Sequence, residues 1–318
     1  FAAKGILPSD IAFIRSHVRK AQILDRSDRL IQDTYEKRDL WMNIPMSMGK
    51  DGAVGNPTTN FADDVFSMWN YTNLFGSWNH GFFSAPGAWV DAAHKNGTNI
   101  MSGIKFFESW GTTSGEWNRI ISEKNTDGTF KYVKPMINCL MYFGSDGINY
   151  NWEDNGFSDA NTIAFNKALH KEAAACGFDN FHLGLYTSND ALNSYNVNSL
   201  FGNSEGRTAH TMLNYASSDF SWDMGTSVEA AEAAMGTSEG LYAGVWIVSM
   251  NRRWTDLNYD ESTKRCGICL WGEHASSRFW SYNSGADAYI AQTNYQALLE
   301  RGFSGGNRNP LNRPRISD

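Results

Sequence analysis

Polar side chains occupy every second position in one apolar run of the chain. Residues 144–157 read GSDGINYNWEDNGF and include Asn149, Asn151 and Glu153. Residues two apart in a β-strand face the same side, so a strand here would align two carboxamides and one carboxyl group. The carboxyl group could transfer a proton, and an amide could orient a polar group of a substrate. The structural alternative is a strand whose polar side chains only hydrogen-bond inside a barrel.

Glycoside cleavage is a reaction that suits this set of residues. It needs a proton delivered to the leaving oxygen and stabilisation of a cationic transition state, tasks that two carboxylates usually share. In substrate-assisted enzymes, a 2-acetamido group of the substrate instead attacks its own anomeric carbon and forms an oxazoline. Such an enzyme needs one proton donor and one polar group that orients the acetamide. On one strand face, Asn151 and Glu153 would stand about 6.5–7 Å apart, which fits this division of tasks.

The composition agrees with a large folded domain that binds sugars. The chain has 318 residues, of which 42% are hydrophobic, so it can bury a substantial core. It contains 12 Trp, 13 Tyr and 19 Phe, and such side chains either stack on sugar rings or fill the core. The formal net charge of −7 argues against nucleic acid as a partner.

Other features of the sequence exclude or weaken competing functions. The chain has no run of about 18 apolar residues, so no membrane span is expected. Cys266 and Cys269 form a C-x-x-C inside an apolar run, which favours buried thiols over a metal site. No Ser–His–Asp set, histidine cluster or phosphate-binding loop is evident, and no cofactor or metal is expected. The chain starts at Phe1 and not at Met, which is compatible with removal of a leader by processing, and we expect a secreted, periplasmic or surface-attached location in preference to the cytoplasm.

Short apolar runs alternate with segments of helical pattern along the chain. The expected strands are residues 40–46, 71–78, 99–107, 147–153, 181–188, 210–217, 241–248 and 266–272, and helical patterns at 86–97 and 162–177 each end at a glycine. Strands alternating with helices predict parallel pairing, and eight such units predict an α/β fold, the (β/α)8 TIM barrel. We expect residues 1–318 to form one catalytic domain with an N-terminal lead-in over 1–38 and a C-terminal tail over about 300–318.

Barrels of this kind carry their chemistry at the carboxyl ends of the strands. The side chains expected there are carboxylates, amides and aromatics: Glu108, Trp110, Asn149, Asn151, Glu153, Tyr186, Asn214, Tyr215, Trp246 and Trp271.

The segment SDGINYNWE resembles the D-G-x-x-x-N-x-E motif of glycoside hydrolase family 85, the endo-β-N-acetylglucosaminidases. It also resembles the D-G-x-D-x-D-x-E motif of family 18, with Asn149 and Asn151 in place of that family's Asp residues. Residues 85–110, APGAWVDAAHKNGTNIMSGIKFFESW, are similar to a family 85 segment that ends in Glu-Trp, and GLYTS, MLNYAS and LYAGVWIVSMNRRW are similar to later family 85 segments. The resemblance therefore covers residues from about 61 to 271 and favours family 85.

The resemblance implies roles for individual residues. Glu153 would be the proton donor and later the base, Asn151 would orient the acetamide, and Tyr186 would bind near the oxazoline. Substrate contacts are expected from Asn149, Glu108, Trp110, Asn214, Tyr215, Trp246 and Trp271. The chain departs from the family pattern at Thr187 and Trp246, where the family has Asp, and at Ser217, where an aromatic residue is common.

The leading interpretation is a monomeric retaining enzyme that cleaves the GlcNAc-β-1,4-GlcNAc core of an N-glycan or glycoprotein. Two alternatives remain open on the sequence alone. One is a family 18-type chitinase or endoglycosidase, and the other is a catalytically silent glycan-binding barrel.

Overall fold

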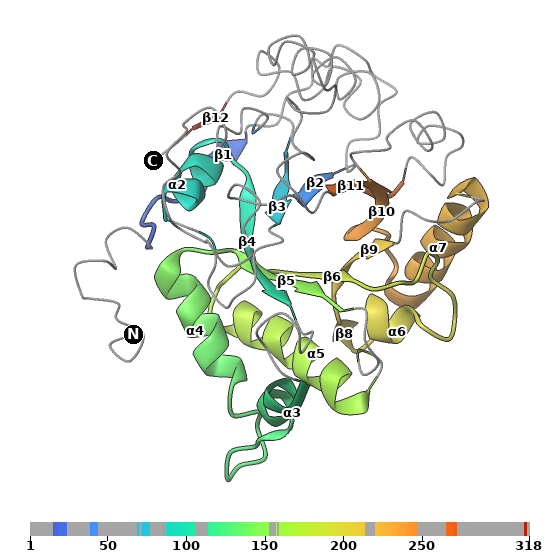
Figure 1. Ribbon diagram of the computed structural model, residues 1–318, viewed down its shortest axis with the longest axis horizontal. Helices are drawn as coiled ribbons and strands as arrows, with labels where there is room; N and C mark the ends of the chain where they lie inside the picture. The colour runs from blue at the N-terminus through green and yellow to red at the C-terminus, as the bar shows by residue number, and fades with distance from the viewer. Residues whose placement is uncertain are drawn as a thin grey trace.

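The computed structural model describes residues 15–23, 39–43, 69, 72–76, 85, 87–105, 114–152, 157, 159–213, 220–246, 265–271 and 315–316. Within this part of the chain, eight parallel strands close into a barrel in the order β10-β11-β2-β3-β4-β5-β6-β9 (Figure 1). The strands are β2 (Leu40–Asn43), β3 (Leu74–Gly76), β4 (Asn99–Lys105), β5 (Gly147–Asn151), β6 (His182–Tyr186), β9 (His210–Leu213), β10 (Leu241–Trp246) and β11 (Gly267–Trp271). Each lies within one of the expected strands, so the predicted (β/α)8 barrel is confirmed.

Helices connect the strands on the outside of the barrel. They are α2 (Gly87–Lys95), α3 (Ser114–Ser122), α4 (Val133–Phe143), α5 (Ala160–Ala175), α6 (Val197–Leu200) and α7 (Phe220–Met235). The start of α5 is capped by the Asp159 side chain, which accepts a hydrogen bond from the Asn161 amide at 2.8 Å. The end of α4 is set by Gly144, whose φ of 83° allows its amide to bond the Leu140 carbonyl.

Two pairs of short strands lie outside the barrel. β1 (Gln22–Ile23) pairs antiparallel with β12 (Arg315–Ile316), so segments from the two ends of the chain meet. β7 (Gly202–Asn203) and β8 (Gly206–Arg207) form a small hairpin. These pairs add two-stranded ribbons to the outside without interrupting the eight-stranded order.

Side chains of the barrel strands alternate between two cores. The outward-facing residues, such as Ile100, Ile148 and Leu183, pack with the helices in one large cluster. The inward-facing residues form a second cluster in the barrel interior: Trp41, Leu74, Met101, Tyr186, Met212, Tyr242, Cys269 and Trp271. The interior is therefore filled by side chains, as it is in barrels of this class.

The pairing registers order the inward side chains into levels along the barrel axis. In a (β/α)8 barrel the residues of one level come from alternate strands. A lower level contains Trp41, Met101, Gly184 and Tyr242. A β-carbon at Gly184 would lie only 2.9 Å from Trp41 Cη2 and 2.9 Å from Met101 Cε, so the indole crosses the barrel because residue 184 has no side chain. Trp41 thus forms an apolar floor, and the carboxyl ends of the strands lie above it.

Candidate active site

Asn151 is the last residue of β5 and projects into the carboxyl end of the barrel. It pairs in register with Tyr186 of β6, and 6% of its surface is exposed. Its Oδ1 atom is buried and has no hydrogen-bond partner among the described residues. Leaving a buried acceptor unsatisfied typically costs about 1–3 kcal/mol. The site therefore presents a hydrogen-bond acceptor that an incoming N–H group could satisfy.

Two aromatic rings face one another beside Asn151. Tyr186 ends β6 and Trp271 ends β11, on the other side of the barrel. Their ring centroids are 6.4 Å apart with an interplanar angle of 28°, and both residues are less than one-tenth exposed. An aromatic surface of this kind can hold the apolar face of a sugar ring, while the tyrosine hydroxyl can bond to a polar substituent.

Below Asn151, an amide pair crosses the barrel interior. The Asn149 Nδ2 group donates a hydrogen bond of 2.9 Å to Oδ1 of Asn43, the last residue of β2. Asn43 is 1% exposed and Asn149 is 4% exposed, so the hydrogen bond between them is shielded from water. Sequence reasoning did not select Asn43. The available signal was an asparagine at the end of the first apolar strand, LWMN.

The residue that follows Asn151 faces the opposite side of the strand. Trp152 is buried among the helices, with ring centroids 5.7 Å from Trp117 of α3 and 6.0 Å from Tyr150. The regular alternation along β5 therefore extends to this position. Glu153 lies outside the described residues.

The structure brings together, in the barrel interior, four of the predicted site residues: Asn149, Asn151, Tyr186 and Trp271. Trp246 ends β10 in register with Trp271, although its side chain is not described. Residues Glu108, Trp110, Asn214 and Tyr215, like Glu153, lie outside the described residues.

The start of β5 is anchored by a buried histidine–aspartate pair. Asp146 Oδ2 accepts hydrogen bonds of 2.8 Å from His94 Nε2 and 2.8 Å from the Ile100 amide. Nδ1 of His94 lies 2.6 Å from the Val18 carbonyl oxygen, so both ring nitrogens face acceptors. Burial lowers the pKa of His94, but the hydrogen bond and charge of Asp146 outweigh it and leave that pKa raised. The Asp of the D-G motif therefore holds α2, β4 and β5 together at the end of the barrel remote from Asn151.

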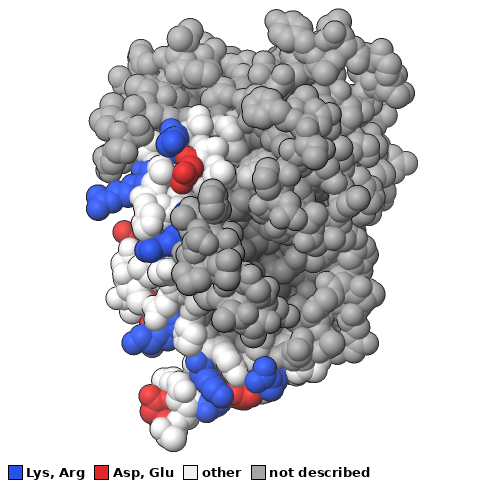
Figure 2. Space-filling model, turned by 60° about the vertical axis from the view of Figure 1, so that its left-hand side comes forward, with Lys and Arg blue, Asp and Glu red and all other residues white. Residues whose placement is uncertain are grey.

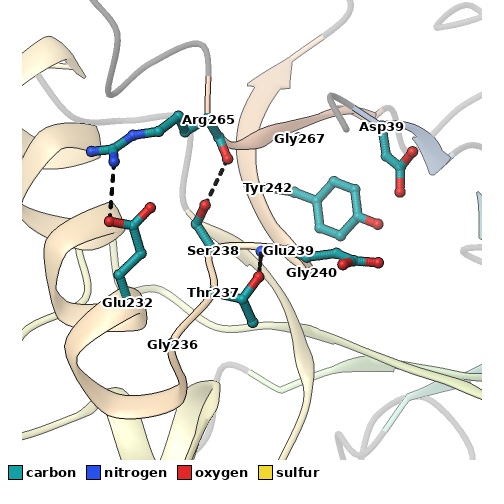
Figure 3. A pocket seen from close by; sticks show the side chains of 10 residues that line it. All are labelled: Asp39, Glu232, Gly236, Thr237, Ser238, Glu239, Gly240, Tyr242, Arg265 and Gly267. Carbon is teal, nitrogen blue, oxygen red and sulfur yellow. Dashed lines mark hydrogen bonds and ion pairs between the residues drawn. The ribbon is translucent and has the colours of Figure 1, made fainter. Parts of the chain in front are cut away.

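A polar pocket lies at the amino end of the barrel, opposite the candidate site. It has a cavity volume of about 190 Å³ and is lined by Asp39, Glu232, Gly236, Thr237, Ser238, Glu239, Gly240, Tyr242, Arg265 and Gly267 (Figure 3). Arg265 Nη1 pairs with Glu232 Oε2 at 3.1 Å, and Ser238 Oγ donates to the Arg265 carbonyl at 2.8 Å. These contacts tie the end of α7 to the start of β11, which is a structural role.

Charges of both signs lie on the described part of the surface. Figure 2 shows Lys and Arg side chains beside Asp and Glu on the described part of one face. Glu123, for example, lies 2.7 Å from Lys131 Nζ and 3.3 Å from Arg119 Nη1. Among the described residues, no helix is long and apolar enough to cross a membrane. Within the same ranges, no group of three or more His, Cys, Asp or Glu side chains could hold a metal ion.

A closed parallel barrel with amides and aromatic rings at its carboxyl end is the arrangement expected of a (β/α)8 glycoside hydrolase. The model of glycosyl hydrolase family 85 matches residues 49–245. The chain therefore belongs to glycosyl hydrolase family 85. No curated protein sequence matches it.

Solved structures support the same fold. The chain is similar to the Endo-D glycoside hydrolase domain of Streptococcus pneumoniae R6, with 18% identity and a TM-score of 0.69 over 90% of this chain and 48% of that one. It thus spans about half the length of that structure. It is also similar to the spore cortex-lytic enzyme SleL of Bacillus cereus, with 9% identity and a TM-score of 0.53 over 89% of this chain and 78% of that one.

Proposed function

We propose that this chain is a retaining endo-β-N-acetylglucosaminidase that cleaves the GlcNAc-β-1,4-GlcNAc core of N-glycans through an oxazoline intermediate. The observation that carries the proposal is the buried Oδ1 of Asn151 at the carboxyl end of β5, which has no hydrogen-bond partner in the part of the chain that the structure describes. That acceptor is complementary to the N–H of a 2-acetamido group. Membership in family 85 and the Glu two positions along the chain supply the context.

In the proposed reaction, the acetamide N–H of the −1 sugar donates a hydrogen bond to Asn151 Oδ1. The acetamide oxygen then forms a bond with the anomeric carbon while the glycosidic C–O bond breaks, and Glu153 transfers its proton to the departing oxygen. Positive charge develops on the acetamide nitrogen, so the hydrogen bond to Asn151 strengthens in the transition state. Glu153 then removes a proton from water as the water opens the oxazoline, and the configuration at the anomeric carbon is retained.

The aromatic pair supplies binding and orientation in this scheme. The Tyr186 hydroxyl would bond to the acetamide oxygen, and the Trp271 ring would carry the apolar face of the −1 sugar. Neither side chain would exchange a proton with the substrate. Their substitution should therefore reduce rates less than substitution of Glu153 does.

Two variants test the proposal by separating the two chemical steps. Glu153→Gln should reduce release of glycan from a high-mannose glycopeptide by about 10²–10⁴-fold, because the proton donor is lost. Asn151→Ala should block oxazoline formation from the glycopeptide but largely preserve hydrolysis of a preformed glycan oxazoline. Equal loss of both steps would assign Asn151 a structural role, and undiminished release by Glu153→Gln would reject the mechanism.

The products identify the substrate class in the same assay. Mass spectrometry of a panel of N-glycopeptides should show cleavage between the two core GlcNAc residues, with one GlcNAc left on the peptide. Faster turnover of soluble chitooligosaccharides would instead indicate a chitinase. Binding of N-glycan without any product after long incubation would indicate a silent glycan-binding barrel.

A further inference from the structure

Asn43 lies in the barrel interior, as Asn151 does, but has no part in the reaction described above. It is at the carboxyl end of β2, and the registers place it level with Tyr186, above the Trp41 floor. Its side chain is 1% exposed. A polar amide is costly at such a position unless each of its groups is hydrogen-bonded.

Only one side of the Asn43 amide is satisfied within the described part of the chain. Oδ1 accepts the bond from Asn149 Nδ2, whereas Asn43 Nδ2 is buried with no hydrogen-bond partner there. Because an amide has one oxygen and one nitrogen on opposite sides, the bond from Asn149 determines which way the Asn43 Nδ2 group points. The amide pair thus presents a donor in a fixed direction.

The neighbouring strands are shaped to permit this arrangement. Strands β3 and β4 lie between β2 and β5 in the barrel. The β3 residue in register with Asn43 is Gly76. A β-carbon at Gly76 would lie 3.1 Å from Asn43 Oδ1 and 3.2 Å from Asn149 Nδ2. On β4 the residue in register with Asn149 is also a glycine, Gly103. Two positions without side chains therefore flank the path along which the amides meet.

Among the described residues, the Nδ2 donor of Asn43 and the Oδ1 acceptor of Asn151 are both buried without a hydrogen-bond partner. We propose that Asn43 is a substrate-binding residue whose Nδ2 group donates a hydrogen bond to an oxygen of the −1 sugar held by Asn151, and that Asn149 orients this donor. The inference rests on the proposed function, because it takes the sugar beside Asn151 as the ligand. A 2-acetamido sugar carries a group complementary to each of these atoms: an amide N–H for Asn151 Oδ1 and oxygen acceptors for Asn43 Nδ2.

The substitution Asn43→Asp removes the hydrogen-bond donor at this position and keeps the acceptor. A carboxylate at position 43 can still accept from Asn149, but it cannot donate, so kcat/KM on a high-mannose glycopeptide should fall about 10- to 100-fold near pH 7.5. Burial raises the pKa of such a carboxyl group, and its protonated form carries an O–H that can replace the missing N–H. The ratio of variant to wild-type kcat/KM should therefore increase as the pH is lowered.

Two further variants make the result decisive. Asn43→Ala should lose activity at every pH, because it cannot donate in any protonation state. Asn99→Asp makes the same chemical change at the opposite end of the barrel, and its activity relative to wild type should not rise at low pH. An Asn43→Asp enzyme as active as wild type, or one whose relative activity falls or stays constant as the pH is lowered, would overturn the inference while leaving the proposed function intact. An inactive wild-type chain would overturn both.

Discussion

Replacing Gly76 by alanine tests whether the interior of the barrel is packed as described. The added methyl carbon would lie 2.5 Å from Trp41 Nε1, closer than van der Waals contact allows. Trp41 has no room to retreat, because its ring meets Tyr242 edge-to-face at 5.3 Å and closely abuts Gly184. The methyl group would also press on the Asn43–Asn149 bond from β3.

These contacts determine how far the substitution should lower the free energy of unfolding. Overpacking a well-filled interior lowers the free energy of unfolding by about 1–3 kcal/mol. Disturbing the buried hydrogen bond between the two side-chain amides lowers it by about 1–3 kcal/mol more. Allowing for partial relaxation, we expect the free energy of unfolding to fall by about 3 kcal/mol. With about 2 °C per kcal/mol in a chain of this size, the melting temperature should fall by about 6 °C.

Urea unfolding followed by tryptophan fluorescence measures this change, and Gly115→Ala provides the matched control. Gly115 lies in α3, and a β-carbon there would meet nothing within 4 Å. Alanine favours the helix by about 0.5–1 kcal/mol, so the control variant should be as stable as the wild type or slightly more stable. If Gly76→Ala were within 0.5 kcal/mol of the wild type, a margin of about the scatter expected for neutral substitutions, the inferred packing of Trp41 and the amide pair would be wrong.

Acid should destabilise the barrel through a cluster of histidines at the amino end of the strands. Burial, Arg207 and His182 lower the pKa of His170 to about 3, and burial also lowers the pKa values of His182 and His210. The unfolded chain therefore binds more protons than the folded chain, so the free energy of unfolding should fall as the pH drops from about 6.5 towards about 3. Urea titrations at several pH values measure this dependence, and His170→Gln should make it shallower. His94 has the opposite sign: its pKa is raised, so its contribution to stability should be lost as the pH rises through that value, and His94→Gln should remove this loss. Thiol titration provides a separate check, because Cys176 is exposed whereas Cys266 and Cys269 are buried and burial raises the pKa of Cys269. An aromatic disulfide reagent should modify Cys176 in the native protein and Cys269 only after unfolding, and rapid native modification of Cys269 would contradict the packing of β11.

The sequence was sufficient to predict those features that depend on local periodicity. The period of two along 147–153 predicted a strand with Asn149 and Asn151 on one face, and both side chains do lie inside the barrel. The same alternation placed Trp152 on the opposite face, where it packs on Trp117. Alternating strands and helices predicted the barrel, because parallel strands need a crossover between them.

Only the tertiary structure decided which distant residues meet. The bond between Asn43 and Asn149 joins positions 106 residues apart, and it exists because the barrel closes with a particular register and leaves Gly76 beside the pair. The contact of Tyr186 with Trp271 likewise depends on registers that span several strands, and the contact of His94 with Asp146 depends on how α2 packs against the start of β5. A residue's face on a strand follows from its neighbours in the chain, whereas its partner across the barrel follows from the closure of the whole sheet.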